Sequence, residues 1–280
     1  MNKLNKFKEF AKRTPIIREI ALFLLRTRIA AAYLLEQLSK IIDWLLRSRE
    51  AVNFTYDLTD LNKQYLASLI AGITSRSFQE ISAYMQELED DGELRRHIEE
   101  AIRASNWRHF ADTTVHYGRR LGWYAVARAI KPRVIVETGV DKGLGSCVLT
   151  SALIRNEQEG MPGHYYGTDI NPNAGFLLDG KYRRYGEVLY GDSILSLEKL
   201  EISIDLFVND SDHSAHYEAR EYQTISGKLS PGAILLGDNS HSTSALLEFS
   251  LTTGRQFVFF QEKPLRHWYP GAGIGISFRR

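Results

Sequence analysis

The sequence contains very little cysteine, and this scarcity limits the chemistry open to it. Cys147 is the only cysteine among the 280 residues. A single thiol excludes disulfide bonds and cysteine-based zinc sites within one chain, and it fits a reducing cytoplasm. We therefore expect a cytoplasmic protein that is stabilised by an apolar core. The 44% of hydrophobic residues is sufficient to build one.

The sequence also has no overall excess of charge. Lys and Arg number 35 against 34 Asp and Glu, so the formal net charge is +1. Without a basic excess, the charge gives no reason to expect nucleic acid as a partner. The charge is unevenly placed, however, because residues 1–50 hold eleven Lys or Arg against five Asp or Glu.

No uninterrupted apolar run is long enough to cross a membrane. The segment from Ile16 to Leu46 is rich in apolar residues, but seven charged residues interrupt it, and a span needs about 20 mostly apolar positions. It also lacks the pattern of a signal peptide, because Arg26 and Arg28 follow its short apolar run at once. The helical spacing instead predicts one or two amphipathic helices. These would pack on the body or on a second subunit of a homo-oligomer, or would attach peripherally to an anionic membrane.

Residues 57–118 show the periodicity of several helices, over 58–70 and 78–88 among others. A further helix over 117–130 ends at Lys131-Pro132. We expect residues 1–118 to form a helical region that serves as a lid or an oligomer contact. Residues 119–280 then form the functional domain.

From Arg133 onwards, short apolar runs alternate with helical patterns. This alternation predicts an α/β fold, a parallel sheet with helices on both faces. The last two strands, 256–261 and 273–278, are joined by a loop without a helix, which favours antiparallel pairing. The expected earlier strands are 134–136, 165–168, 187–190, 204–208 and 233–236, and the expected helices are 144–157, 173–183, 193–200, 214–229 and 240–252.

A glycine-rich turn follows the first expected strand, in the run Glu137-Thr138-Gly139-Val140-Asp141-Lys142-Gly143-Leu144-Gly145-Ser146. Glycines permit a tight turn and close approach of a ligand to the backbone. Their spacing is not that of a dinucleotide-binding GxGxxG loop, so a nicotinamide oxidoreductase fits poorly.

The next two strands end at Asp169 and Asp192, and ligands of such sheets bind at the carboxyl ends of the strands. A carboxylate such as that of Asp169 can accept hydrogen bonds from both ribose hydroxyls. Alternatively, Asp169 forms a turn before Asn171-Pro172, and Asp192 or Ser193 caps the following helix.

A second set of polar residues follows the fourth and fifth strands. The fourth ends in Val208-Asn209-Asp210-Ser211-Asp212-His213-Ser214, and the fifth in Leu236-Gly237-Asp238-Asn239. If these strands are parallel neighbours, Asp210, Asp238 and Asn239 meet at one rim. Their oxygens form a ligand set that suits Mg²⁺, which can lower the pKa of a substrate hydroxyl.

Residues 133–280 resemble the class I S-adenosylmethionine-dependent methyltransferases. The Asp-Ser-Asp-His-Ser run, with Leu229-Ser230-Pro231-Gly232-Ala233 after it, resembles the macrocin and mycinamicin sugar O-methyltransferases. The Asp238-Asn239 pair is similar to that of the metal-dependent catechol and caffeoyl-CoA O-methyltransferases. This sequence departs from the macrocin pattern at Ser211, where Gly is usual, and at Asn239, where a second Asp is usual.

The resemblance implies roles for individual residues. S-adenosylmethionine would contact Glu137 through its methionine part and Asp192 through its adenine, and His213 would be the general base, with Asp212 as the rival base. Neutral imidazole near its ordinary pKa of about 6.5 can accept a hydroxyl proton. The expected metal ligands are Asp210, Asp238 and Asn239, and the expected cofactor-binding residues are Glu137, Thr138, Gly139, Gly143, Ser146, Asp169, Asp192 and Asp210.

The expected function is therefore O-methylation of a hydroxyl on a sugar, a glycosylated compound or another small natural product, with S-adenosylmethionine and Mg²⁺. Three alternatives remain open at this stage. The same residues could form a metal-free methyltransferase site. Asp212 or Ser214 could merely cap a helix. The chain could also be a non-catalytic nucleotide-binding or interaction protein whose helical half carries the function.

Overall fold

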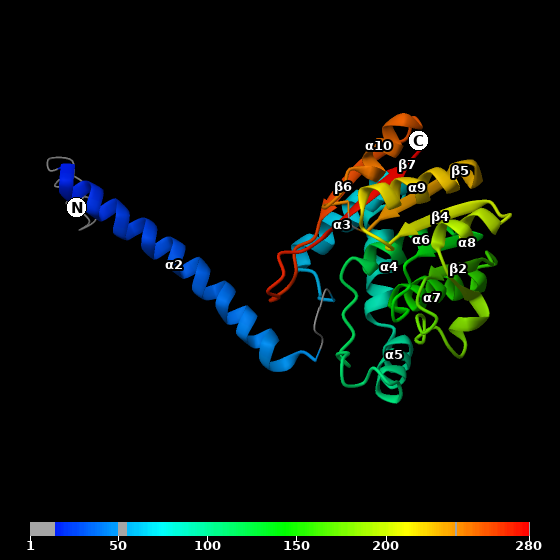
Figure 1. Ribbon diagram of the computed structural model, residues 1–280, viewed down its shortest axis with the longest axis horizontal. Coiled ribbons are helices and arrows are strands. Elements are labelled where there is room, and N and C mark those ends of the chain that lie inside the picture. Colours follow the sequence, from blue (N-terminus) through cyan, green and yellow to red (C-terminus); the bar gives the residue numbers. More distant parts are fainter. Residues whose placement is uncertain (1–14, 50–54, 239, 280) are drawn as a thin grey trace. The chain divides into compact units, whose positions relative to one another are not determined.

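The computed structural model describes residues 15–49, 55–238 and 240–279 (Figure 1). The described chain divides into two units, of which the smaller holds helix α2 (Pro15–Arg47) and Arg266–Trp268. The amphipathic pattern of the sequence thus forms one continuous helix of 33 residues. None of the helices in the described ranges is long and apolar enough to span a bilayer.

The larger unit is built on a seven-stranded sheet in the order β3-β2-β1-β4-β5-β7-β6. Strands β1 to β5 are parallel, and β7 is antiparallel to both β5 and β6. The expected α/β fold, mostly parallel with antiparallel end strands, is confirmed. The strands are β1 (Val134–Thr138), β2 (His164–Asp169), β3 (Gly186–Tyr190), β4 (Ile204–Asn209), β5 (Leu229–Gly237), β6 (Gln256–Gln261) and β7 (Gly273–Phe278).

Helices cover both faces of this sheet, and the alternation of side chains along the strands explains why. Leu206 and Val208 of β4 join one hydrophobic cluster, while Phe207 between them joins the other. Both faces are therefore apolar, as a parallel sheet covered on two sides requires. One face packs under α3 (Asp60–Thr74), α4 (Phe78–Glu89), α5 (Gly92–Ala104), α6 (Arg120–Ile130) and α7 (Leu144–Gln158), and the other under α8 (Ser193–Lys199), α9 (Ala215–Ile225) and α10 (Ala245–Thr252).

Helices α3 to α5 share their hydrophobic core with the sheet. Leu66, Ile81 and Ile98 are buried in the same cluster as Ile135 of β1. Side chains of Thr59, Ser77 and Asp91 cap these helices at their N-termini. The helices α3 to α5 lie in the same compact unit as the sheet. The expected boundary between a helical region and a functional domain, at residues 118 and 119, stays a prediction.

One expected helix is wrong. Residues 173–183 form turns and a short 3-10 helix, η1 (Tyr182–Tyr185), rather than an α-helix. Gly175 and Gly180 have φ angles of +73° and +57°, outside the right-handed helical region. In addition, the backbone N–H groups of Gly175 and Leu177 donate to the carbonyls of Asp141 and Lys142. Through these two hydrogen bonds the segment holds the glycine-rich turn after β1 in place.

Candidate functional site

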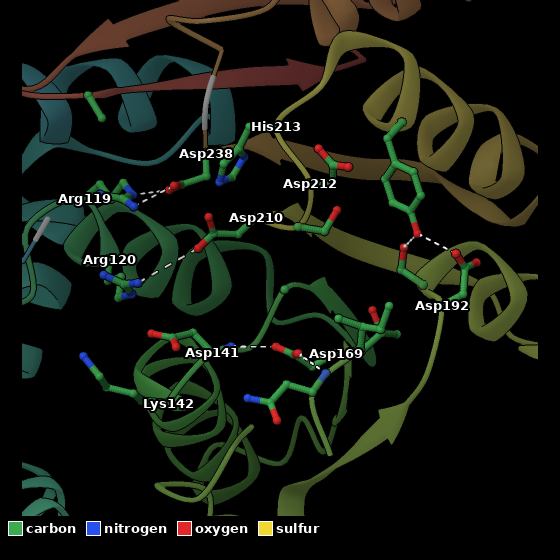
Figure 2. A pocket seen from close by; sticks show the side chains of 18 of the residues that line it. Arg119, Arg120, Asp141, Lys142, Asp169, Asp192, Asp210, Asp212, His213 and Asp238 are labelled. Atoms are coloured by element: carbon green, nitrogen blue, oxygen red, sulfur yellow. Dashed lines mark hydrogen bonds and ion pairs between the residues drawn. The ribbon is translucent and has the colours of Figure 1, made fainter. Parts of the chain in front are cut away.

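A cavity of about 760 Å³ opens at the carboxyl ends of β1, β2, β4 and β5 (Figure 2). Parallel α/β sheets bind ligands at this edge. Seven of the residues predicted from the sequence line it: Gly139, Asp169, Asp192, Asp210, Asp212, His213 and Asp238. Four others, Glu137, Thr138, Gly143 and Ser146, are not among its lining residues. Asn239 lies outside the described residues.

Gly139 allows the ends of β1 and β4 to approach each other. Its φ angle is +82°, and a Cβ built on it would lie 1.9 Å from the carbonyl oxygen of Asp210. Because only glycine fits both constraints, the backbone after β1 can pass directly beside the Asp210 loop. The cavity thus begins where two strand ends nearly touch.

Glu137 is buried beneath this turn instead of lining the cavity. Its carboxylate accepts hydrogen bonds from the hydroxyls of Tyr165 and Ser146. Burial raises the pKa of Glu137 to about 7, despite these bonds, which favour the ionised form. The side chain holds the glycine-rich turn against β2.

Asp169 and Asp192 stand at the ends of β2 and β3, on the side of the cavity away from Arg119 (Figure 2). The backbone N–H groups of Asp141 and Asn171 donate to Asp169, at 2.9 and 2.8 Å. Asp192 caps α8 by accepting from the N–H of Leu195, and this bond helps to lower its pKa. The capping alternative is therefore correct for Asp192, although the residue also lines the cavity.

Glu221 of α9 joins the ends of several strands beneath the cavity. Its buried carboxylate accepts hydrogen bonds from the side chains of Thr138, Ser193, Asn209 and Ser211. These residues lie at the ends of β1 and β4 and at the start of α8. Ser211 stands where glycine is usual in the resembling family, and its hydroxyl donates a hydrogen bond to Glu221. Burial raises the pKa of Glu221, and its hydrogen bonds oppose that shift.

The opposite end of the cavity is dominated by a buried ion pair. Arg119, directly before α6, donates to both carboxylate oxygens of Asp238 (Figure 2). Its guanidinium also lies 3.8 Å from Glu262, which accepts a hydrogen bond from Tyr56 at 2.8 Å. Gly118 lets the backbone before Arg119 pass close to Tyr56, because a Cβ on Gly118 would lie 2.8 Å from the carbonyl oxygen of Tyr56.

Asp210 lies between this pair and a second arginine. Its carboxylate is hydrogen-bonded to Asp238, and Arg120 lies 4.0 Å away. Burial and the charge of Asp238 raise the pKa of Asp210 well above its ordinary value. Burial acts in the same direction on Asp238, but the Arg119 guanidinium holds the pKa of Asp238 below its ordinary value. Asp210 is therefore the partner that keeps the shared proton.

The charge balance of this cluster bears on the expected metal site. Both oxygens of Asp238 already accept hydrogen bonds from Arg119, and Arg120 lies beside Asp210. No group of three or more acidic, histidine or cysteine side chains in the described ranges is arranged to hold a metal ion. A cation at Asp238 would have to displace a buried arginine. The described residues therefore do not fit Mg²⁺, which prefers unobstructed carboxylate oxygens.

Asp212 and His213 follow Asp210 at the mouth of the cavity. The carboxylate of Asp212 accepts the backbone N–H of Ser214, which fixes the turn into α9. Both residues line the cavity. Partial burial of the His213 ring and the positive charge of Arg119 lower its pKa, so the imidazole is neutral at pH 7. A neutral imidazole beside the cavity can accept a proton.

Arg119, Arg120 and Glu221 were not predicted from the sequence. Arg119 stands directly before the apolar helix α6, Arg120 is the first residue of that helix, and Glu221 lies within α9. The available signal was weak, namely charged residues on helices with otherwise buried faces. The partners of Arg119 and Arg120 lie 90 to 143 residues away, and those of Glu221 come from separate strand ends, so spacing along the chain could not reveal them.

Comparison with known proteins identifies part of the chain. Residues 136–240 match the family model Methyltransf_24, described as a methyltransferase domain. A search of curated proteins finds no match. We conclude that the chain contains a methyltransferase domain, and the matched residues span strands β1 to β5.

Solved structures support the fold. An O-methyltransferase structure from Klebsiella pneumoniae is 16% identical, with a TM-score of 0.51 over 68% of this chain and 90% of that one. The O-methyltransferase TomG of Streptomyces achromogenes, involved in tomaymycin synthesis and solved with S-adenosylmethionine, is 17% identical, with the same TM-score and the same two coverages. At these identities the likeness establishes the fold alone.

Glu137→Gln should change how stability depends on pH. Between its ordinary pKa of 4.5 and about 7, the folded state holds a proton that the unfolded chain releases. The wild-type free energy of unfolding should therefore fall as pH rises through this window, by about 3 kcal/mol, and the variant should lack this contribution. Urea unfolding at pH 5 and pH 8 measures the difference. Glu187→Gln, at an exposed position on β3, should follow the wild-type profile.

Glu221→Gln should weaken both the fold and the cavity. An amide NH₂ would face side chains that now donate to the carboxylate, so we expect a loss of about 1–3 kcal/mol in the free energy of unfolding. Binding of S-adenosylhomocysteine should weaken with it. Glu218→Gln is the matched control, because Glu218 is buried one turn earlier and accepts a hydrogen bond from Thr243. Wild-type stability in Glu221→Gln would contradict the role given to this side chain.

Proposed function

We propose that this protein transfers the methyl group of S-adenosylmethionine to a hydroxyl oxygen of a small, polar acceptor. The observation that carries the proposal is the division of one cavity into two chemically different halves. Gly139, Asp169 and Asp192 line the half formed by β1 to β3, whereas Arg119, Asp210 and His213 line the other. The first half suits a nucleoside, and the second suits a hydroxylated acceptor.

The cofactor half provides the contacts that a nucleoside needs. The backbone N–H groups of Asp141 and Asn171 hold the carboxylate of Asp169, which is thereby oriented at the strand end. A carboxylate in this place can accept hydrogen bonds from two ribose hydroxyls. Asp192 is held by Leu195 and Tyr217 and borders the same space, where an adenine amine could donate to it.

The acceptor half is lined mainly by charged and polar groups. Arg119, Arg120, Asp210 and Asp238 converge there, and Tyr269 borders the opening. Side chains that both donate and accept hydrogen bonds suit a compound with several hydroxyls, since each buried hydroxyl needs a partner. A sugar or a glycosylated natural product fits this description, and we propose it as the acceptor class.

The proton balance of the transfer assigns a role to His213. S-adenosylmethionine supplies a methyl group on a positively charged sulfur, which is already activated for attack. The acceptor oxygen must lose its proton as the new carbon–oxygen bond forms. His213 is neutral at pH 7 and lies at the mouth of the cavity, so its imidazole nitrogen can take that proton. Asp212, which also lines the cavity, is the alternative base.

Arg119 and Arg120 take the place that a metal would have in this proposal. Their positive charges lie beside Asp238 and Asp210, as a divalent cation would, and their N–H groups can donate to the acceptor oxygen as it becomes negative. We therefore propose a metal-free reaction in place of the Mg²⁺-assisted one that the sequence suggested. Positioning and electrostatics supply most of the rate.

Substitution of His213 tests the assignment of the base. His213→Ala should lower turnover by about 10²- to 10⁴-fold while S-adenosylhomocysteine binding stays unchanged, because the side chain moves a proton and does not hold the cofactor. In the wild type, the rate should fall on the acidic side with an apparent pKa below 6.5, because the pKa of His213 is lowered. Asp212→Asn provides the comparison. If it loses turnover and His213→Ala does not, Asp212 is the base.

Chelation tests the metal-free reaction. Enzyme dialysed against EDTA should keep its activity within about 2-fold, because Arg119 already occupies Asp238. Calorimetry with S-adenosylhomocysteine in the same buffer separates this question from cofactor binding. Activity that disappears in EDTA and returns with Mg²⁺ would restore the metal-dependent mechanism. Absence of S-adenosylhomocysteine binding at micromolar concentration would contradict the proposed function itself.

A further inference from the structure

Helix α2 has a feature that the methyltransferase site does not explain (Figure 1). None of its 33 residues is buried. Exposing a large apolar side chain to water costs free energy, and a contiguous exposed apolar surface commonly marks a site of interaction. The large apolar residues of α2 therefore call for a partner of apolar character.

These apolar residues gather along one side of the helix. At 100° per residue, twelve of them fall within a sector about 140° wide, which we call the apolar stripe. Eleven of the twelve are exposed, by 37% to 80%. The stripe consists of Ile16, Ile17, Ile20, Phe23, Leu24, Leu34, Leu35, Leu38, Ile41, Ile42, Leu45 and Leu46.

The stripe runs straight along the helix axis. Eighteen residues make five full turns, and the first five members of the stripe recur eighteen positions later as its next five: Ile16, Ile17, Ile20, Phe23 and Leu24 correspond to Leu34, Leu35, Leu38, Ile41 and Ile42. A seven-residue repeat, as in a coiled-coil seam, is also present at Ile17, Leu24, Leu38 and Leu45, but it drifts by about 20° per heptad and crosses a stripe that is wider than such a seam. A straight, wide stripe about 50 Å long fits a flat surface better than a second helix.

The charged residues of α2 lie on the other side. Seven of the eight fall outside the apolar stripe, and Arg28 alone lies within its limits. The three acids Glu19, Glu36 and Asp43 each form an ion pair with a base of the same helix. The acidic charge of the polar side is thereby offset within the helix.

The sequence around the start of α2 is strongly basic. Residues 1–28 contain eight Lys or Arg and two Glu, a net charge of +6. A basic segment next to an apolar stripe complements a surface that is apolar inside and anionic at its edge. An anionic lipid bilayer has this character, and each basic residue near it contributes to binding.

We propose that α2 binds the surface of an anionic lipid bilayer, with its apolar stripe in the headgroup and acyl boundary and its charged side towards water. The helix lies along the membrane, because its charged residues prevent a span. The methyltransferase unit is then tethered at the membrane surface. This tether is independent of the catalytic proposal, since it involves none of the cavity residues.

Vesicle sedimentation with the full-length protein tests the proposal. We expect the protein to sediment with phosphatidylcholine vesicles containing about 30% phosphatidylserine, and to bind phosphatidylcholine alone at least about 10-fold more weakly. Raising the salt concentration to about 0.5 M should weaken the anionic component, because charges at a surface are screened. Light scattering in the absence of vesicles measures the oligomeric state in parallel.

The helix provides a matched pair of double variants. Leu24→Asp with Leu38→Asp places two charges within the apolar stripe, whereas Leu22→Asp with Leu25→Asp places the same two charges outside it. The first should lose at least about 10-fold in vesicle binding, and the second should stay within about 3-fold of wild type. Thermal unfolding of both variants confirms that the methyltransferase unit remains folded.

Three results would overturn the proposal. One is no sedimentation of the wild type with anionic vesicles. Another is equal binding by the two double variants. The third is a wild-type oligomer that the stripe variant converts to monomer without any vesicle binding, which would identify a second copy of α2 as the partner.

Discussion

The ion pair between Arg119 and Asp238 is the constraint on which the acceptor end of the cavity depends. Both side chains are almost fully buried. A buried charge that loses its partner typically costs about 3–5 kcal/mol, so neither residue can leave without large rearrangement. Because Arg119 precedes α6 and Asp238 follows β5, the pair fixes the N-terminal helical layer against the carboxyl edge of the sheet.

The pair also determines the protonation of its neighbours. Arg119 keeps Asp238 ionised, and the negative charge of Asp238 in turn keeps the proton on Asp210. The same guanidinium reaches Glu262 and, through it, Tyr56. A line of polar contacts therefore crosses the molecule from the segment before α3 to the end of β4. This end of the cavity thereby gains a fixed pattern of charges.

The cofactor half is organised by a different principle. Glu221 holds the ends of β1 and β4 through neutral donors, and no arginine or lysine is among its hydrogen-bond partners in the described chain. Neutral hydrogen bonds fix positions without adding positive charge. The anionic groups that line this side are Asp141, Asp169 and Asp192, with Lys142 beside them.

Much of this fold was predictable because its signals are local. Alternating apolar runs predicted all seven strands, and the antiparallel end followed from the helix-free link after Gln261. The helix expected at 173–183 is wrong because Gly175 and Gly180 adopt left-handed conformations and the N–H of Gly175 donates to the distant carbonyl of Asp141. Asp210, Asp238 and His213 were expected from their strand ends, and all three line the cavity. Arg119 was missed because its partners lie far along the chain, and Glu221 because its partners come from separate strand ends. The sequence likewise gives no sign that an arginine covers Asp238, one of the expected metal ligands.

The separation of Arg119 and Asp238 along the chain also constrains how this enzyme can diversify. The charges of the acceptor half come from three separate stretches of the gene, around residues 119, 210 and 238. A mutation of Arg119 or Asp238 alone leaves a buried charge without its partner. Relatives with a different acceptor should therefore show coordinated replacement of these positions, with arginine and aspartate lost or retained together. A change of substrate specificity should be easier through single substitutions at the rim of the cavity, for example at Tyr269 or Asp212.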